Sequence, residues 1–469
     1  MMTDQTLSRM SDRLDDWRPD DMAFWVDGGK PIAMRNLAIS AFALLLASCV
    51  WMVWSAVVVH LPIVGFSYTT TQLLWLTAAP GLSGAVLRLV YAFTVPIFGG
   101  RLWTTISTAS LLIPALGIGI AVQHPETPYG VMLVLALLCG FGGGNFASSM
   151  ANISFFFPKE QKGWALGVNA GMADLGVAVV QFAVPLVIGG ALLGPLGGGP
   201  HAAAALGAPL DTHQGVWLQN AAFIWIPFIL LATAAAWFGM NDIGHSQASF
   251  AEQAVIFRRM HTWINGWLYI GSFGTFIGFA ATFPMLVKAQ FPGIDPLAYA
   301  FLGPLVSSAA RSLSGGMADR LGGARITLWA FVILFLAVST MTICLNSGVF
   351  WMFLLSSMLV FATAGVACAS TYQMVPIVFL IDRMHAYDLQ GDLGRARALK
   401  EATLEAATAL GFISALAAFG AFYIPGVFGL SISLTGSPVM AIQLFLIFYL
   451  SCIVVTWMFY CRANAGLHC

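Results

Sequence analysis

The sequence predicts an all-α membrane protein with twelve transmembrane helices, arranged as two pseudo-symmetric six-helix halves with both termini in the cytoplasm. Three observations lead to this prediction: the hydropathy of the chain, the distribution of its basic residues, and an internal repeat. The 469 residues are 59% hydrophobic and only 9% charged, and their mean hydropathy is +0.84. Soluble proteins carry about 25% charged residues. Helices satisfy their backbone polar groups internally, so a chain this apolar is expected to cross lipid as helices.

Twelve apolar stretches are long enough to span a bilayer, which takes about 20 helical residues. Turn-rich or charged segments, such as QHPETPYG at 123–130, separate them. The predicted spans are residues 38–60, 72–98, 103–122, 129–157, 163–190, 216–239, 263–287, 296–318, 325–346, 349–379, 402–424 and 438–461.

Four regions follow from these spans. Residues 1–36 form an acidic tail without the apolar region of a signal peptide, and we predict that this tail is cytoplasmic. Residues 37–240 and 263–462 form the two six-helix halves. Residues 241–262 form a polar linker between the halves, also predicted to be cytoplasmic.

The basic residues test the number and orientation of these spans. If both termini are inside, the cytoplasmic segments contain 17 of the 20 Lys and Arg, and the outside loops contain only Lys288. This asymmetry is typical of membrane proteins, whose cytoplasmic loops are enriched in basic residues. The two basic residues that remain, Arg88 and Arg311, lie within predicted spans.

These two arginines are related by the internal repeat. Arg88 precedes the pair Gly99-Gly100 by eleven residues, and Arg311 precedes Gly322-Gly323 by the same distance. Similarity between two six-helix halves is typical of secondary transporters, which bind substrate near the bilayer midplane where the halves meet. Eleven helical residues span about 16 Å, roughly half of a hydrocarbon core about 30 Å thick. We therefore predict that both arginines lie near the midplane.

Only one acid is available to neutralise them. Of the 20 Asp and Glu residues, Asp174 alone falls deep inside a predicted span. Two cations with one possible counter-ion leave a net positive site, which favours an anionic ligand; the alternative is that the arginines are structural. Asp174 itself has two interpretations. It is either a salt-bridged or neutral polar residue lining the site, or a titratable group that carries a coupling proton.

Other chemistry is not indicated. The seven cysteines lie mostly within apolar runs and form no CxxC motif, the eight histidines are scattered singly, and there is no P-loop. We expect no enzyme activity, no metal site, no cofactor and no nucleic-acid partner.

Several segments resemble one known family. Residues 140–177, GFGGGNFASSMANISFFFPKEQKGWALGVNAGMADLGV, resemble the nitrate signature of the nitrate/nitrite porter family (the NarK type) of the major facilitator superfamily. Residues 364–374 resemble the second signature of that family, and residues 315–325 are similar to the loop motif of the superfamily. The resemblance extends over about residues 37–462. One departure is that Ala-Asp stands at 173–174 where the family usually has Gly-Asn.

The resemblance implies roles for individual residues. It implies that two arginines bind nitrate or nitrite, two phenylalanines sandwich the planar anion, a tyrosine hydroxyl reaches it, and two polar residues of the signatures line the site; Asp174 is added to the lining because of its depth in the span. In the same order, the residues implied by the resemblance are Arg88 and Arg311, Phe146 and Phe273, Tyr269, and Asn169 and Ser370. The residues implied for conformational loop motifs are Gly99, Gly100, Arg101, Asp319, Arg320 and Arg325.

The function that follows is nitrate/nitrite transport across the cytoplasmic (inner) membrane of a bacterium, with nitrate taken up in exchange for nitrite. One alternative is a proton-coupled nitrate symporter that uses Asp174. An alternative from another class is an anion sensor that binds without transport. The expected partners are these anions and the lipid bilayer, and a monomer is the working expectation for the oligomeric state.

Overall fold

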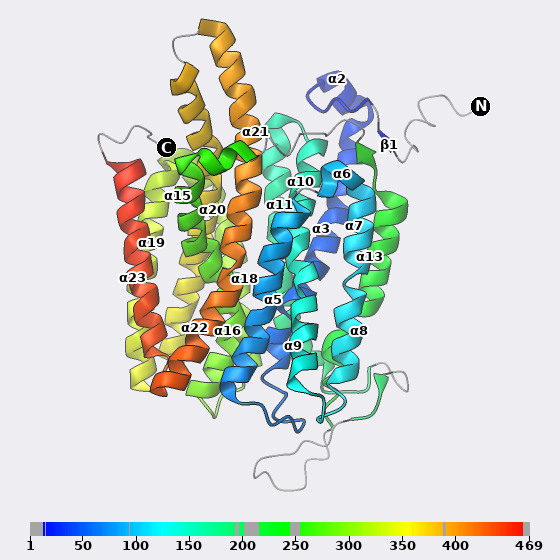
Figure 1. The fold of residues 1–469 in the computed structure, drawn as a ribbon, viewed down its shortest axis with the longest axis vertical. Helices are drawn as coiled ribbons and strands as arrows, with labels where there is room; N and C mark the ends of the chain where they lie inside the picture. Colours follow the sequence, from blue (N-terminus) through cyan, green and yellow to red (C-terminus); the bar gives the residue numbers. More distant parts are fainter. Residues whose placement is uncertain are drawn as a thin grey trace, which may run out of the picture.

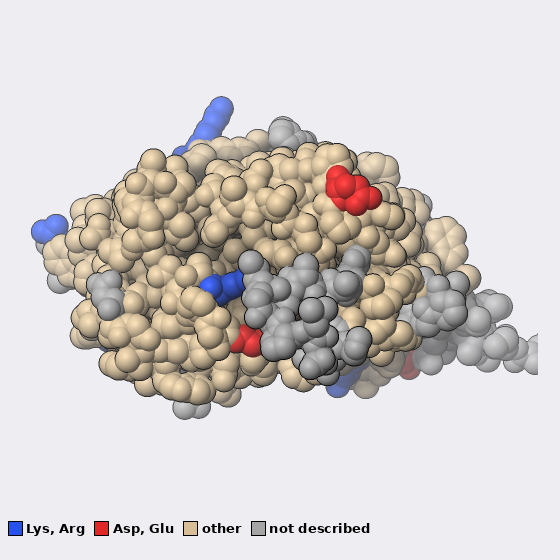
Figure 2. Space-filling view, turned by 90° about the horizontal axis from the view of Figure 1, so that it is seen from below, with Lys and Arg blue, Asp and Glu red and all other residues tan. Residues whose placement is uncertain are grey.

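The protein is a bundle of long helices that run roughly along one axis (Figure 1). The structure is a computed structural model, and it describes residues 13–14, 16–92, 94–192, 197–200, 215–243, 254–387 and 391–462. The N-terminal strand β1 (Arg13–Leu14) and the C-terminal end of the last helix lie at the same end of the bundle. We refer to that end as the terminal end. Seen from the opposite, distal end, the described surface is largely uncharged (Figure 2).

The first half contains six spans, several of which are interrupted by a turn. In chain order their helices are α3 (Lys30–Met52) with α4 (Trp54–Val57), α5 (Thr70–Tyr91) with α6 (Thr94–Phe98), α7 (Gly100–Ala109) with α8 (Leu112–Ala121), α9 (Tyr129–Leu138) with α10 (Gly140–Phe156), α11 (Lys159–Val187), and α12 (Asn220–Phe223) with α13 (Trp225–Gly239).

The second half repeats this arrangement. Its helices are α15 (Met260–Tyr269) with the π-helical turn η4 (Ile270–Gly274) and α16 (Thr275–Gln290), α17 (Leu297–Ala300) with α18 (Leu302–Leu321), α19 (Gly323–Ser347), α20 (Phe350–Tyr387), α21 (Gly391–Ala418) with α22 (Gly420–Thr435), and α23 (Val439–Thr456) with η6 (Trp457–Cys461).

The described helices of the two halves form twelve spans, as predicted. Within the described residues, eleven helical segments are long and apolar enough to cross a membrane by length and composition. Helix α18 supplies the twelfth. It is less apolar than the others because it carries Arg311 together with serine and glycine residues in its middle and terminal parts.

Two helices extend well past the predicted spans. Helix α20 continues to Tyr387 instead of stopping near 379, and α21 begins at Gly391 instead of 402. Both protrude from the terminal end of the bundle (Figure 1). The residues added to α21 include Arg, Ala, Leu, Lys and Glu, which are strong helix formers. The intrinsic helix propensity of these residues therefore favours a helix beyond the apolar span.

The internal repeat is visible in the backbone. Gly99 precedes α7 with φ +84°, and Gly322 precedes α19 with φ +88°. This left-handed region favours glycine because a side chain would be strained there. The following glycines lie against helices that correspond in the two halves: Gly100 packs on Asn152 of α10, and Gly323 packs on Met374 of α20.

The chain segment before the first span packs on the first half. Strand β1 pairs in parallel with β2 (Asp242–Ile243), which follows α13. The indole of Trp17 donates a hydrogen bond to the carbonyl of Phe155 over 3.1 Å. The short helix α2 (Met22–Phe24) and the π-helical η1 (Trp25–Gly29) then lead into α3. The only strands among the described residues are therefore two-residue segments, and the fold is otherwise helical.

Candidate anion-binding site

Arg88 lies in the middle of the bundle and is buried, with 2% of its surface exposed. Its Nε donates to the carbonyl of Gly143 over 2.8 Å, and its Nη1 donates to the carbonyl of Ser414 over 3.1 Å. Gly143 is in α10 of the first half, whereas Ser414 is in α21 of the second half. Among the described residues no carboxylate forms an ion pair with Arg88. Its guanidinium is therefore held in place by neutral acceptors, and no carboxylate of the described residues is in direct contact to balance its charge.

Arg311 has a different environment. Its Nη1 forms an ion pair with Oδ2 of Asp174 at 2.7 Å, and its Nη2 donates to the hydroxyl of Tyr269 over 3.3 Å. The side chains of Arg311 and Asp174 are 11% and 4% exposed, so the pair is shielded from solvent. Asp174 belongs to α11 and Arg311 to α18, two helices of opposite halves that pack against each other.

Three aromatic rings connect the two arginines. The guanidinium carbon of Arg88 lies 4.5 Å from the ring centroid of Phe146 and 5.3 Å from that of Phe273. Phe273 stacks on Tyr269 at 5.6 Å with an interplanar angle of 12°, and Tyr269 reaches Arg311. Phe273 lies in the π-helical turn η4, a helix irregularity that is frequent at functional sites.

Six of the eight predicted lining residues therefore come together around one point. They are Arg88, Phe146, Asp174, Tyr269, Phe273 and Arg311.

Asn169 and Ser370 are hydrogen-bonded elsewhere. The Nδ2 of Asn169 donates to the hydroxyl of Ser149 over 2.8 Å, which ties α11 to α10 within the first half. The hydroxyl of Ser370 accepts a hydrogen bond from Thr327 over 2.8 Å, which ties α20 to α19 within the second half. Both side chains are fully buried. Their contacts hold neighbouring helices of one half together.

The implied loop-motif residues lie at the terminal end. The backbone N–H of Arg101 donates to Oδ1 of Asp242 over 2.7 Å, and its guanidinium lies 5.1 Å from the Trp237 ring. Gly99 makes the tight turn before α7, and Gly100 is the first residue of that helix. Arg325 is exposed near the start of α19. The side chains of Asp319 and Arg320 lie outside the described part of the structure.

Sequence reasoning missed three groups that hold Arg88. The indole of Trp51 lies 5.1 Å from its guanidinium carbon, and the other two groups are the backbone carbonyls of Gly143 and Ser414. Trp51 is one of fifteen tryptophans in an apolar chain, and no spacing distinguishes it. A backbone carbonyl leaves no signal in the residue type at all.

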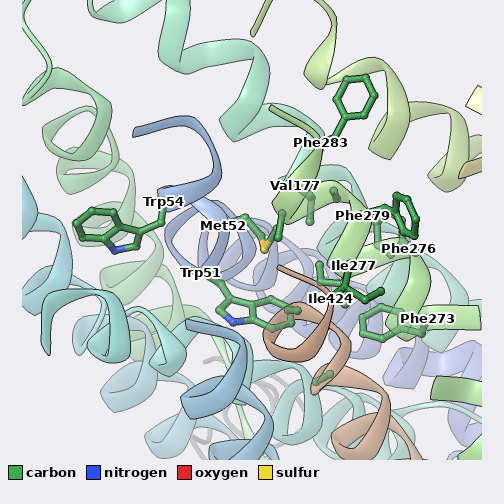
Figure 3. Close-up of a cluster of buried hydrophobic side chains, with 14 of the residues drawn as sticks. Trp51, Met52, Trp54, Val177, Phe273, Phe276, Ile277, Phe279, Phe283 and Ile424 are labelled. Carbon is green, nitrogen blue, oxygen red and sulfur yellow. The ribbon is translucent and has the colours of Figure 1, made fainter. Parts of the chain in front are cut away.

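An apolar cluster lies on the distal side of these residues. Trp51 and Met52 of α3, Ile277 of α16 and Ile424 of α22 gather beside Phe273 (Figure 3). These side chains come from both halves and are all buried. The cluster places buried apolar side chains from both halves between the arginines and the distal end of the bundle.

Polar contacts between the halves lie further toward the distal end. Gln181 of α11 donates to the carbonyl of Ala280 in α16 over 2.7 Å. Lys288, at the end of α16, donates to the carbonyl of Val59. The two halves are therefore joined on the distal side of the arginines.

This arrangement is suited to a small, flat, monovalent anion. Two guanidinium groups offer planar, forked donors. Arg88 carries a positive charge without a carboxylate partner, and aromatic rings provide flat apolar walls beside it. Among the described residues there is no group of three or more His, Cys, Asp or Glu side chains that could hold a metal ion.

Comparison with known proteins agrees with this geometry. The family model of the Major Facilitator Superfamily matches residues 41–387. The nitrate/nitrite transporter NarU of Salmonella typhimurium is 49% identical over 452 residues, which cover 96% of this chain and 96% of that protein. NarU of Escherichia coli is 49% identical over 454 residues, again with 96% of each chain covered. The probable nitrate/nitrite antiporter NarK2 of Thermus thermophilus is 41% identical over 461 residues, covering 97% of this chain and 98% of that protein.

The fold and the family model define the class of protein as a multi-pass membrane protein of the transporter type. The chain belongs to the Major Facilitator Superfamily and, within it, to the NarK-type nitrate/nitrite porter family. The prediction of a twelve-helix fold of this superfamily is confirmed. Membership of the nitrate/nitrite porter family, which the sequence resemblance indicated, is confirmed as well.

Proposed function

We propose that this protein transports nitrate and nitrite across the cytoplasmic membrane of a bacterium, and that it takes up nitrate in exchange for nitrite. The observation that carries the proposal is the pair of central arginines, one from each half, with Phe146 and Phe273 beside Arg88. Relatives at 41–49% identity over nearly their whole length carry the names of nitrate/nitrite transporters or antiporters.

Transport would proceed by alternating access, in which the two halves rock about the central site. Arg88 and the Asp174–Arg311 pair both make contacts that cross the boundary between halves. An anion that touches both arginines would therefore contact both halves at once. Binding and release of the anion would then change the forces between the halves, which is the requirement for coupling substrate to movement.

Exchange is favoured by the electrical cost of net anion uptake. Moving one negative charge inward against a negative-inside potential costs about 2.3 kcal/mol per 100 mV. A nitrate that enters while a nitrite leaves moves no net charge. We further propose that the terminal end of the bundle faces the cytoplasm, because 17 of the 20 Lys and Arg belong to the segments that the sequence predicts to be cytoplasmic.

Proton-coupled nitrate uptake remains a second candidate, and one observation favours it. Asp174 is a buried carboxylate deep in a span and in direct contact with an arginine of the site. Cotransport of protons with nitrate would offset the electrical cost in another way. In that case replacement of Asp174 by Asn would abolish the dependence of uptake on a pH gradient.

The test is uptake of labelled nitrate into proteoliposomes containing the purified protein. The vesicles are preloaded with nitrite, with nitrate or with buffer, and each set is assayed with and without an imposed pH gradient. Uptake that needs an internal anion and ignores the gradient supports exchange. Uptake into buffer-loaded vesicles that needs an acidic exterior supports proton symport. Binding of nitrate without uptake under any condition contradicts a transport function.

A further inference from the structure

Asp174 forms an ion pair with Arg311, one of the two arginines proposed to bind the anion. Anion binding by two arginines does not by itself require a carboxylate at this position. The carboxylate of Asp174 occupies one side of the Arg311 guanidinium, and the hydroxyl of Tyr269 accepts a hydrogen bond from another nitrogen of the same group. An incoming anion that approaches Arg311 therefore meets a guanidinium that already donates to a carboxylate and to a hydroxyl from two of its nitrogens. The same anion meets no competing carboxylate at Arg88.

We propose that Asp174 is an internal counter-anion that competes with the transported anion for Arg311, and so lowers affinity and speeds release. This inference rests on the proposed function. Nitrate or nitrite binds first at Arg88, and its second contact forms only as the carboxylate of Asp174 gives way. When the anion leaves, Asp174 pairs with Arg311 again.

The charges at the centre support this role. Arg88 and Arg311 contribute two positive charges and Asp174 one negative charge, which leaves one positive charge among these three groups. A monovalent anion neutralises that remaining charge. A buried charge without a partner is strongly unfavourable. The pairing therefore protects Arg311 when the site is empty, while the charge of Arg88 continues to attract an anion.

The position of the pair adds a reason why competition matters. Asp174 is on α11 of the first half and Arg311 is on α18 of the second, so their contact crosses the boundary that must change during transport. A carrier that binds its substrate too tightly releases it slowly, because affinity differences are expressed mainly in dissociation rates. A competing carboxylate weakens the bound state without removing either arginine.

A purely structural role for Asp174 predicts something else. If the ion pair only holds the two halves together, its removal lowers stability and does not tighten nitrate binding. If Asp174 competes with substrate, its removal tightens binding and slows exchange at saturation. These opposite changes in affinity and turnover distinguish the two roles.

The experiment measures nitrate binding to purified Asp174→Asn by isothermal titration calorimetry, together with nitrate exchange in nitrate-loaded proteoliposomes. Asparagine keeps the size of the side chain and removes its charge. We expect the Kd for nitrate to fall about 10-fold, which corresponds to about 1.4 kcal/mol, and the maximal exchange rate to fall several-fold. Asp174→Ser is expected to change both quantities in the same direction, and it replaces Asp174→Asn if that variant does not fold.

Two further variants make the test specific. In an Arg311→Gln background, Asp174→Asn is expected to leave the nitrate Kd unchanged, because Asp174 and nitrate no longer compete for a shared guanidinium. Glu405→Gln is the matched control. Glu405 is also buried and forms an ion pair with an arginine, Arg259, at 2.6 Å. That pair does not join the two halves, because Glu405 lies in α21 and Arg259 lies directly before α15. We expect no change in nitrate Kd for Glu405→Gln.

The outcomes separate this inference from the proposed function. If the unmodified protein binds and exchanges nitrate but Asp174→Asn and Asp174→Ser bind it with equal or lower affinity, the competition is refuted and the transport function stands. If the unmodified protein neither binds nor exchanges nitrate, both are refuted. If Glu405→Gln tightens binding as much as Asp174→Asn does, the effect is not specific to the site and the inference fails.

Discussion

Arg88 and Arg311 occupy equivalent positions in the two halves, yet their partners differ in kind. Arg88 is fixed by two backbone carbonyls and lies near the faces of Trp51, Phe146 and Phe273. Arg311 is fixed by a carboxylate and a tyrosine hydroxyl.

The difference shows that the repeat preserves depth and backbone geometry but not charge balance. Gly99 and Gly322 adopt nearly the same conformation eleven residues beyond each arginine. Only the second arginine has an acid, however, and that acid comes from the opposite half. The site is electrically asymmetric, with Arg88 as the cation that lacks a counter-ion among the described residues.

Lysine at each arginine position gives the largest expected effects. A lysine ammonium keeps the charge but cannot form the planar fork of a guanidinium. We expect Arg88→Lys to lower kcat/KM for nitrate exchange at least about 100-fold, because hydrogen bonds to charged groups contribute about 1.5–3 kcal/mol each and two are at stake. We expect Arg311→Lys to lower it about 10-fold, because a lysine can still pair with Asp174. Initial exchange rates in proteoliposomes check both values.

Equal losses at the two positions would contradict the asymmetry between the arginines. Full activity in either variant would contradict a site built on both of them.

Leucine in place of the aromatic walls gives a smaller effect. The ring of Phe146 is nearer to the guanidinium of Arg88 than the ring of Phe273 is. A desolvated cation–π contact contributes about 2 kcal/mol. We expect Phe146→Leu to weaken nitrate binding about 10-fold and Phe273→Leu about threefold, measured as Kd by calorimetry. A larger loss for Phe273→Leu would show that Phe273 has a role other than its contact with Arg88.

Removal of the Tyr269 hydroxyl tests the Arg311 side alone. The hydrogen bond from Arg311 to this hydroxyl is 3.3 Å long, and the ring of Tyr269 stacks on Phe273 independently of it. We expect Tyr269→Phe to raise the KM for nitrate about threefold, which corresponds to a hydrogen bond at the weak end of the usual range. An effect as large as that of Arg311→Lys would mean that the hydroxyl contacts the anion directly.

The smallest effect on transport is expected for Ser370→Ala. The hydroxyl of Ser370 accepts a hydrogen bond from Thr327 within the second half and makes no contact with either arginine. We expect the KM for nitrate to stay within about twofold, and the free energy of unfolding to fall by about 1 kcal/mol because the Thr327 hydroxyl loses a buried partner. Exchange assays and chemical unfolding in detergent measure the two quantities. A 10-fold rise in KM would contradict this expectation and would indicate that Ser370 lines the anion site.

Features that depend on local sequence were predictable. Hydropathy and loop charge set the spans, and the distance from each arginine to its glycine pair sets the depth of both arginines. The end of α20 and the start of α21 were not predictable from hydropathy, because α20 continues after its apolar residues stop and α21 begins before its apolar residues start. The pairing of β1 with β2 joins segments more than 200 residues apart and depends on the packed first half.

The partners of the polar residues depend on how each helix is rotated against its neighbours. Asn169 and Asp174 are five residues apart on α11, which places them about 140° apart around the helix axis. One therefore faces α10 within its own half, and the other faces α18 in the opposite half. The sequence placed both residues at a suitable depth, but depth alone does not determine which neighbouring helix a side chain meets.

The long protruding helices offer a practical way to observe the movement of the halves. Helix α20 has 38 residues and is therefore about 57 Å long. This is nearly twice the thickness of a hydrocarbon core, which is about 30 Å. A rigid arm of this length magnifies a small rotation: a 10° tilt about the centre displaces a point about 40 Å away by about 7 Å. Leu393, which is 86% exposed near the start of α21, is a suitable attachment point for a spectroscopic label. The distance between a label at Leu393 and a second label on the first half would change by several ångströms for a small rotation of the halves.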